Sequence, residues 1–331
     1  MKCMLRKAFA FFVLFGILNS ILSFCPIPKY LRVPKLRTII IDPGHGGVDH
    51  GTHGLISTEK DIALDISLKL GKAIQEEFPD IKIVFTRTSD MLPGGGDDYH
   101  AALAVRAEIA NKAKGDLFIC VHCNSNGKPA GGYYAKRVIG HKKKTVYVGS
   151  GSKKRKKVIN APIYESYWEK NTRVGTESYI WKADRAGFKA DAINETDEGG
   201  ADLVDSADTD FDMTSSVAKI RAQLYEQKFF DNSFLFASLV EDEFKKGGRE
   251  SWGVKQRDRG IHVLQATGMP SVLIETGFLT NKEEEEYLNS DKGQDEVVEN
   301  ILNALVRYKN ELENGHQGSV TNSSDQDSKQ N

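Results

Sequence analysis

The stretch that most constrains the fold is a β-branched apolar run, Thr38 to Ile41, which leads directly into the glycine-rich turn Asp42-Pro43-Gly44-His45-Gly46-Gly47. An apolar run bounded by proline and glycine is typical of a buried strand and its exit. The glycines leave little side-chain bulk beside His45, so a ligand or metal could approach its ring. Since open α/β sheets place their sites at the carboxyl ends of strands, His45 is a candidate functional residue. An ordinary turn with a solvent-facing histidine is the alternative.

Two further apolar runs end in a comparable way. The run that begins at Asp116 leads to His122, and the run that begins at Ser271 leads to Glu275. Three buried strands that each end at a potential ligand or base indicate one shared site. A hydrolytic zinc site holds the metal with three protein ligands and keeps a fourth position open for water. His45, His122 and one carboxylate would make such a site.

Glu59 is the best candidate for that carboxylate. It lies at the first turn of a predicted helix whose apolar residues recur every four positions from Ile62 to Phe78. The strand-turn-helix geometry can return Glu59 over the same sheet edge as His45. By itself, a glutamate at a helix start usually only complements the helix dipole. Glu275, which arrives on a different strand, is then the natural general base.

Predicted strands and helices alternate along the first part of the chain. This order predicts an α/β fold with a largely parallel twisted sheet and helices on both faces. With 331 residues, of which 40% are hydrophobic, the chain can form one sizeable domain with insertions. After the first helix we expect a strand over 81–85, a helix over 101–114, a long helix over 217–246, strands over 261–264 and 272–274, a short helix capped by Asn281, and a final amphipathic helix through Val297, Ile301 and Leu305.

Residues from about 131 to 216 interrupt this pattern, and we interpret them as an insertion in a catalytic domain that spans 36–312. The insertion holds two basic clusters, Lys142 to Lys144 and Lys153 to Lys157, of a kind that is more often a solvated loop than a binding patch. Its aromatic stretch from Ile163 to Trp181 could be buried. The net charge of -1 gives no global attraction to nucleic acid, and no nucleic-acid partner is expected.

Both ends of the chain carry their own signals. Basic residues precede the apolar run Ala8 to Leu22, which predicts a signal peptide over 1–25 and export to the periplasm. A transmembrane anchor is the alternative, but the run is short of the ~20 apolar residues that span a bilayer. Leu22 to Cys25 is similar to a lipobox, so a lipid anchor in the outer membrane through Cys25 is a second alternative. The polar residues 313–331 predict a disordered tail.

Cys120 and Cys123 have the C-x-x-C spacing found in redox and zinc motifs. Here the spacing runs along a strand, where residues three apart lie ~10 Å apart and point to opposite faces. Because a disulfide needs Cα atoms within ~7 Å of each other, we predict no bridge between them. Both are expected to be small buried packing residues.

Taken in order, the motifs resemble those of the zinc-dependent N-acetylmuramoyl-L-alanine amidases of the Amidase_3 family. The resemblance covers about 37–310 without the insertion, and Cys123 departs from it because the family usually has alanine there. It implies zinc held by His45, Glu59 and His122, with Glu275 as acid/base. The implied reaction is hydrolysis of the amide between N-acetylmuramic acid and L-alanine in peptidoglycan, during wall remodelling or daughter-cell separation. The motifs are Ile41 to Gly47, Glu59-Lys60, Phe85-Thr86-Arg87, Arg106, Val121 to Ser125 and Ile274 to Asn281.

Some members of this family carry an extra segment between the second histidine motif and the last glutamate motif, which covers the zinc until an activator protein displaces it. The insertion lies in the same interval. Its acidic part, Asp191 to Asp212, includes Glu195 and Glu198, either of which could occupy the open zinc position. A solvated surface loop is the alternative.

Three other functions stay open from the sequence. They are a non-catalytic wall-binding protein, a zinc hydrolase of another amide, and a polyanion-binding module that uses the lysine clusters.

Overall fold

The computed structural model describes residues 36–182, 216–257 and 261–314. The predicted signal peptide with Cys25, the acidic stretch 191–212 with Glu195 and Glu198, and nearly all of the predicted tail lie outside these residues. Residues 36–308 form one compact unit, which contains every residue of the candidate site.

Six strands form the central sheet in the order β2-β1-β3-β8-β6-β7. β1, β2, β3 and β8 are parallel, β6 is antiparallel to β8, and β7 is parallel to β6. The sheet is therefore mostly parallel, which confirms the predicted fold class. The strands are β1 (Thr38–Pro43), β2 (Lys82–Phe85), β3 (Leu117–Asn124), β6 (Thr176–Trp181), β7 (Ser251–Arg257) and β8 (Ser271–Phe278).

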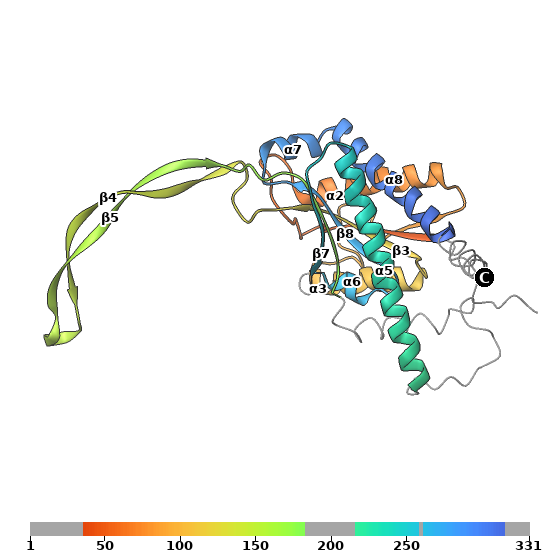
Figure 1. Cartoon of the computed structure of the whole chain (residues 1–331), viewed down its shortest axis with the longest axis horizontal. Coiled ribbons are helices and arrows are strands. Elements are labelled where there is room, and N and C mark those ends of the chain that lie inside the picture. Colours follow the sequence, from red (N-terminus) through yellow and green to blue (C-terminus); the bar gives the residue numbers. More distant parts are fainter. Residues whose placement is uncertain (1–35, 183–215, 258–260, 315–331) are drawn as a thin grey trace, which may run out of the picture. The chain divides into compact units, whose positions relative to one another are not determined.

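Helices lie on both faces of this sheet (Figure 1). On one face, Ala110 of α3 and Val263 of α6 belong to one buried cluster with Phe118 of β3. Alternate residues of the strands, such as Ile119, point to the opposite face and are fully buried too. There α2 and α5 pack against the strands, and α8 packs against α5 through Tyr308 and Phe236. The helices are α2 (Glu59–Glu77), α3 (Tyr99–Lys112), α5 (Ser216–Lys246), α6 (His262–Ala266), α7 (Lys282–Leu288) and α8 (Asp291–Asn314).

Most predicted helices agree with the structure, and Asn281 caps α7 by accepting hydrogen bonds from the backbone N–H groups of Glu283 and Glu284. No helix within the described ranges combines the length and apolar character needed to cross a lipid bilayer.

The strand predicted over 261–264 is wrong, because His262–Ala266 forms helix α6. An apolar run this short does not separate a helical from a strand period. Two strands of the sheet, β6 and β7, were not predicted. β6 lies inside the interval interpreted as an insertion, yet it pairs directly with β8. This interval therefore contributes to the sheet that carries the candidate site.

The rest of this interval that the structure describes is mainly a two-stranded antiparallel ribbon, β4 (Gly132–Val148) and β5 (Arg155–Lys170) (Figure 1). Among the described residues, these two strands form a separate sheet of their own. The basic clusters lie on the ribbon and its turn, so the loop interpretation is wrong. The expectation of buried aromatic residues is wrong for Tyr164, which is 58% exposed, and for Trp168, which is 55% exposed, but it is confirmed for Tyr179 of β6, which is 7% exposed.

Cys120 and Cys123 are both buried and free, as expected. The thiol of Cys120 donates to Oδ2 of Asp42 over 3.0 Å. The Sγ atom of Cys123 lies 3.6 Å from Oγ1 of Thr276. Each thiol therefore packs against a different neighbour.

Candidate metal centre

The turn after β1 has a backbone conformation that few residues adopt. His45 has a φ of 58°, in the left-handed region, and the glycines that follow it have φ values of 128° and 55°. A non-glycine residue in this region is uncommon and needs support from its surroundings. The support comes from two buried arginines that bind the carbonyl groups of the turn.

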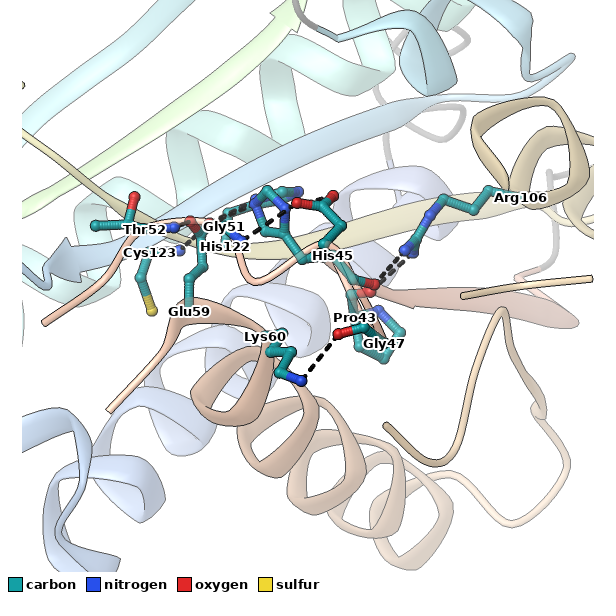
Figure 2. Close-up of polar contacts among 12 residues, drawn as sticks. Pro43, His45, Gly47, Gly51, Thr52, Glu59, Lys60, Arg106, His122 and Cys123 are labelled. Atoms are coloured by element: carbon teal, nitrogen blue, oxygen red, sulfur yellow. Dashed lines mark hydrogen bonds and ion pairs between the residues drawn. The ribbon is translucent and has the colours of Figure 1, made fainter. Parts of the chain in front are cut away.

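Arg87 and Arg106 were both part of the recognised motifs, and the structure shows what they do. Arg87 donates to the carbonyl oxygens of Pro43 and Gly44 over 3.0 and 2.7 Å. Arg106 donates to the carbonyl of Pro43 over 2.8 Å and also to that of His45. These donors satisfy buried carbonyl groups that need a partner. The two arginines therefore hold the backbone of the turn around His45, and Figure 2 shows Arg106 beside this turn.

His45, Glu59 and His122 converge at the carboxyl end of the sheet (Figure 2). Each offers one ligand atom, and these atoms all lie within 4.8 Å of one another. Oε1 of Glu59 lies 3.2 Å from Nε2 of His45 and 2.7 Å from Nδ1 of His122. Two histidines and a glutamate from three separate elements thus surround one point.

Neighbouring groups orient these side chains. Nδ1 of His45 lies 2.8 Å from a carboxylate oxygen of Asp49, so Nε2 is the atom that faces Glu59. Glu59 accepts hydrogen bonds from the backbone N–H groups of Thr52, over 2.8 Å, and Cys123, over 3.0 Å. Outer partners of this kind fix ring orientation and raise ligand basicity at metal sites.

The residues fit a zinc ion. Tetrahedral ligands at 2.0–2.1 Å from zinc lie about 3.3 Å apart, and Oε1 of Glu59 lies 3.2 Å from Nε2 of His45. Glycine is also required beside the rings, because a Cβ atom on Gly44 would lie 2.5 Å from the His122 ring. A Cβ atom on Gly51 would lie 2.5 Å from Cδ2 of His45 and 2.6 Å from Oε2 of Glu59.

The protonation behaviour of the cluster follows from its close contacts. Burial lowers the pKa of His45, but the hydrogen bonds and negative charges of Glu59 and Asp49 outweigh it and raise that pKa to about 9. Burial raises the pKa of Glu59, but the hydrogen bonds from His122 and His45 hold it well below its usual range. Glu59 is therefore an anion at neutral pH, which suits a cation at this point.

Glu275 lies on β8 in register with His122 on β3. Its side chain is buried, and among the described residues its Oε2 atom has no hydrogen-bond partner. Burial is the main cause that raises the pKa of Glu275 to about 8, and the negative charge of Glu59 adds to it. A buried carboxylate with a free oxygen and a pKa near neutrality has the properties of a general base.

The structure thus brings together all four residues named from the sequence, His45, Glu59, His122 and Glu275. Two further carboxylates, Glu177 and Glu285, were missed.

Glu177 of β6 pairs in register with Glu275. It accepts hydrogen bonds from Asn124 over 2.8 Å, Tyr179 over 2.5 Å and Lys255 over 2.6 Å. The only sequence signal for it is the short alternating run of β6, which lies in a segment interpreted as an insertion.

Glu285 of α7 accepts hydrogen bonds from the backbone N–H groups of Leu55, Ile56 and Ser57 over 2.7–2.9 Å. It therefore holds the loop that leads into Glu59. In the sequence, Glu285 is one of four consecutive glutamates and reads as ordinary acidic charge at a helix start.

Fold and cluster together define an α/β protein whose sheet edge carries a candidate three-ligand metal site with a buried carboxylate beside it. The family model described as N-acetylmuramoyl-L-alanine amidase, Amidase_3, matches residues 39–307. The chain belongs to this family, and the resemblance seen in the motifs is confirmed.

Individual relatives agree with this assignment. The chain is 27% identical over 273 residues to N-acetylmuramoyl-L-alanine amidase AmiC of Escherichia coli O6:H1, covering 82% of this chain and 52% of the relative. It is 29% identical over 273 residues to the probable amidase AmiB of Haemophilus influenzae, with the same coverage. The chain thus spans about half the length of these two curated relatives.

Among solved structures, the chain is similar to an N-acetylmuramoyl-L-alanine amidase from Clostridium difficile 630. The TM-score is 0.51 at 21% identity, covering 84% of this chain and 98% of the other. At this identity the likeness supports the fold.

Proposed function

We propose that this chain is a zinc-dependent N-acetylmuramoyl-L-alanine amidase that hydrolyses the amide between N-acetylmuramic acid and L-alanine in peptidoglycan. Family membership supports the reaction. The observation that carries the proposal is the convergence of the ligand atoms of His45, Glu59 and His122 beside the buried carboxylate of Glu275.

In this proposal His45, Glu59 and His122 hold the zinc. A zinc ion held there would polarise a substrate carbonyl and lower the pKa of water from 15.7 to roughly 7. Glu275 accepts the proton of the attacking water at Oε2, the oxygen without a partner among the described residues. It then returns that proton to the leaving amine of L-alanine. In the metal-free protein, burial raises the pKa of this carboxyl group, which makes it a stronger proton acceptor than an exposed glutamate.

The proposed enzyme is exported and acts on the wall from the periplasm, in wall remodelling or daughter-cell separation. The predicted signal peptide supports export, and the substrate class is that named for the family. Lipid anchoring through Cys25 remains the alternative. Inhibition by Glu195 or Glu198, relieved by an activator protein, remains a prediction for residues outside the described ranges.

The test is digestion of purified peptidoglycan by the full chain with and without a zinc chelator. We expect new amino-terminal L-alanine to accumulate, and to stop accumulating when zinc is removed. Release of a different amine would indicate a zinc hydrolase of another amide. Binding to peptidoglycan without any new amine would indicate a non-catalytic wall-binding protein.

A further inference from the structure

The ribbon of β4 and β5 with its turn, residues 132–170, carries a large net positive charge. Its distal half, residues 138–163, contains eight lysine and arginine residues and no aspartate or glutamate, which gives a formal charge of +8 without counting His141. Cross-strand partners share a face, and successive residues alternate between faces. Lys142, Lys144, Arg155 and Lys157 therefore lie on one face of the ribbon, and Lys143 and Lys156 lie on the other, so both faces are cationic.

Stability of the ribbon does not account for this composition. A two-stranded hairpin is marginally stable in water, and like charges placed close together destabilise it. The distal strands also leave one apolar side chain about half exposed on each face, Val148 at 48% beside Arg155 and Val158 at 58% on the face of Lys156. A row of cations interleaved with exposed apolar side chains is better explained by a ligand than by packing.

Aromatic side chains occupy the other half of the ribbon, near its root. Tyr134 pairs across the strands with Trp168, with ring centroids 5.2 Å apart. Tyr164, four residues before Trp168 on the same strand, lies on the same face, and further along β5 this face carries Lys156. Arg155 and Lys157 lie on the opposite face. The three side chains are 74%, 55% and 58% exposed for Tyr134, Trp168 and Tyr164. Exposed aromatic rings with a polar end offer a flat apolar surface and a hydrogen bond to a ligand.

The root of the ribbon is tied to the candidate metal centre. Asn171, which directly follows β5, is buried and donates to the carbonyl oxygens of Pro129 and Thr280 over 2.8 and 3.0 Å. The backbone N–H of Gly131 donates to the same carbonyl of Thr280 over 2.9 Å. Pro129 lies in the loop after the strand of His122, and Thr280 lies in the loop after the strand of Glu275. The ribbon therefore begins at the sheet edge that carries the site.

We propose that the ribbon is a second, non-catalytic binding surface for an anionic glycan polymer. Its cations pair with carboxylates of the polymer, and its aromatic rings stack on sugar rings. The proposal rests on the proposed function for the identity of that polymer, which is peptidoglycan, whose stem peptides carry carboxylates. A surface of this kind retains the enzyme on the polymer that it cuts.

An anionic membrane surface fits the ribbon less well. Segments that bind membranes place apolar side chains such as tryptophan, phenylalanine and leucine where they enter the interface. The turn of the ribbon, residues 149–154, reads Gly-Ser-Gly-Ser-Lys-Lys and has no such side chain.

The test is sedimentation of the zinc-loaded full chain with insoluble peptidoglycan. All proteins carry Glu275→Gln so that the polymer stays intact during the measurement. The ribbon variant combines Lys142→Gln, Lys143→Gln and Lys144→Gln. We expect it to bind about tenfold more weakly than its parent, since each surface ion pair contributes a fraction of a tenfold change in affinity. The matched control neutralises three exposed helical lysines, Lys72, Lys112 and Lys292, and should bind as the parent does.

Two further arms test the two chemistries separately. Peptidoglycan whose carboxyl groups have been converted to amides should retain the parent about as weakly as native polymer retains the ribbon variant. Tyr134→Ser combined with Tyr164→Ser should weaken binding to native polymer, while Tyr99→Ser, at an aromatic residue that is 49% exposed on α3, should not.

Equal binding of the ribbon variant and its parent, or equal binding to native and amidated polymer, would overturn the proposal. Tighter binding to vesicles of anionic lipid than to peptidoglycan, lost in the ribbon variant, would overturn it in favour of a membrane surface. With Glu275 restored, the ribbon variant should still hydrolyse a small soluble muramoyl peptide at the parental rate, which also shows that it is folded. Failure of the parent in that assay would count against the proposed function and leave the binding comparison intact.

Discussion

Arg106→Met should be among the most damaging single substitutions outside the metal ligands. The guanidinium of Arg106 is 4% exposed and pairs with the carboxylate of Asp42, which is 1% exposed. It also holds two carbonyl groups of the turn, those of Pro43 and His45. Methionine fills a similar volume but provides none of these donors.

The expected loss of stability comes mainly from the carboxylate of Asp42, which stays buried after the guanidinium is removed. Breaking a buried ion pair by removing one partner costs ~3–5 kcal/mol, because the other charge remains buried and unpaired. Asp42 keeps the hydroxyl of Thr86 and the thiol of Cys120 as donors, so we expect a loss of about 3 kcal/mol, at the lower end of that range. In a domain of this size that corresponds to a fall of roughly 10 °C in Tm.

Urea unfolding of the metal-free protein, followed by circular dichroism, measures this loss without a contribution from metal binding. The control is Lys112→Met on the same helix, where the side chain is 74% exposed and, among the described residues, pairs with Glu108. That change should alter the free energy of unfolding by less than about 0.5 kcal/mol. Zinc affinity should fall in Arg106→Met but not in Lys112→Met, because only the first change removes the donor that fixes the backbone of His45. If the two variants were equally stable, the account of the turn would be refuted.

Three further predictions follow from the site. Glu285→Gln should lower stability by about 2 kcal/mol, because it replaces a charged acceptor of backbone N–H groups, whereas Glu286→Gln on the same helix should have little effect in the same urea assay. Gly51→Ala and Gly127→Ala each place an alanine at a backbone position with positive φ, but only the new Cβ atom at position 51 would contact His45 and Glu59. Only Gly51→Ala should therefore weaken zinc binding in a chelator competition assay. In the metal-free protein, folded Glu275 keeps its proton up to about pH 8, whereas unfolded Glu275 releases it near pH 4.5. Between these two pH values the unfolded state therefore binds fewer protons than the folded state. The free energy of unfolding should fall as pH rises through this window. Glu275→Gln should flatten that fall in urea titrations, and parallel profiles for the two proteins would contradict the assigned pKa.

Three residues of the candidate site could be predicted because each has a recognisable position in the sequence. His45, His122 and Glu275 each stand at the end of an apolar run, and parallel strands carry such positions to one edge. Glu177 carries no such mark, since β6 is short and lies in a segment of unusual composition. Its importance depends on pairing with β8, a contact between residues 98 positions apart that no local pattern reveals.

The ribbon could not be predicted for a different reason. Strands are recognised from the alternation of buried and exposed residues, and most residues of β4 and β5 are exposed on both faces. Without a buried face, the lysine clusters looked like loops and the aromatic residues looked like candidates for a core. The helix α6 was mistaken for a strand because an apolar run of four residues fits both periods.

The most direct test of the central claim compares zinc content and turnover in two variants of the full chain. Glu275→Gln should retain zinc at the parental stoichiometry by elemental analysis and release no L-alanine amino termini from peptidoglycan. His45→Ala should lose the zinc itself. Loss of zinc from Glu275→Gln would show that Glu275 is a ligand, and parental turnover by that variant would show that the proton acceptor lies elsewhere; either result would contradict the account.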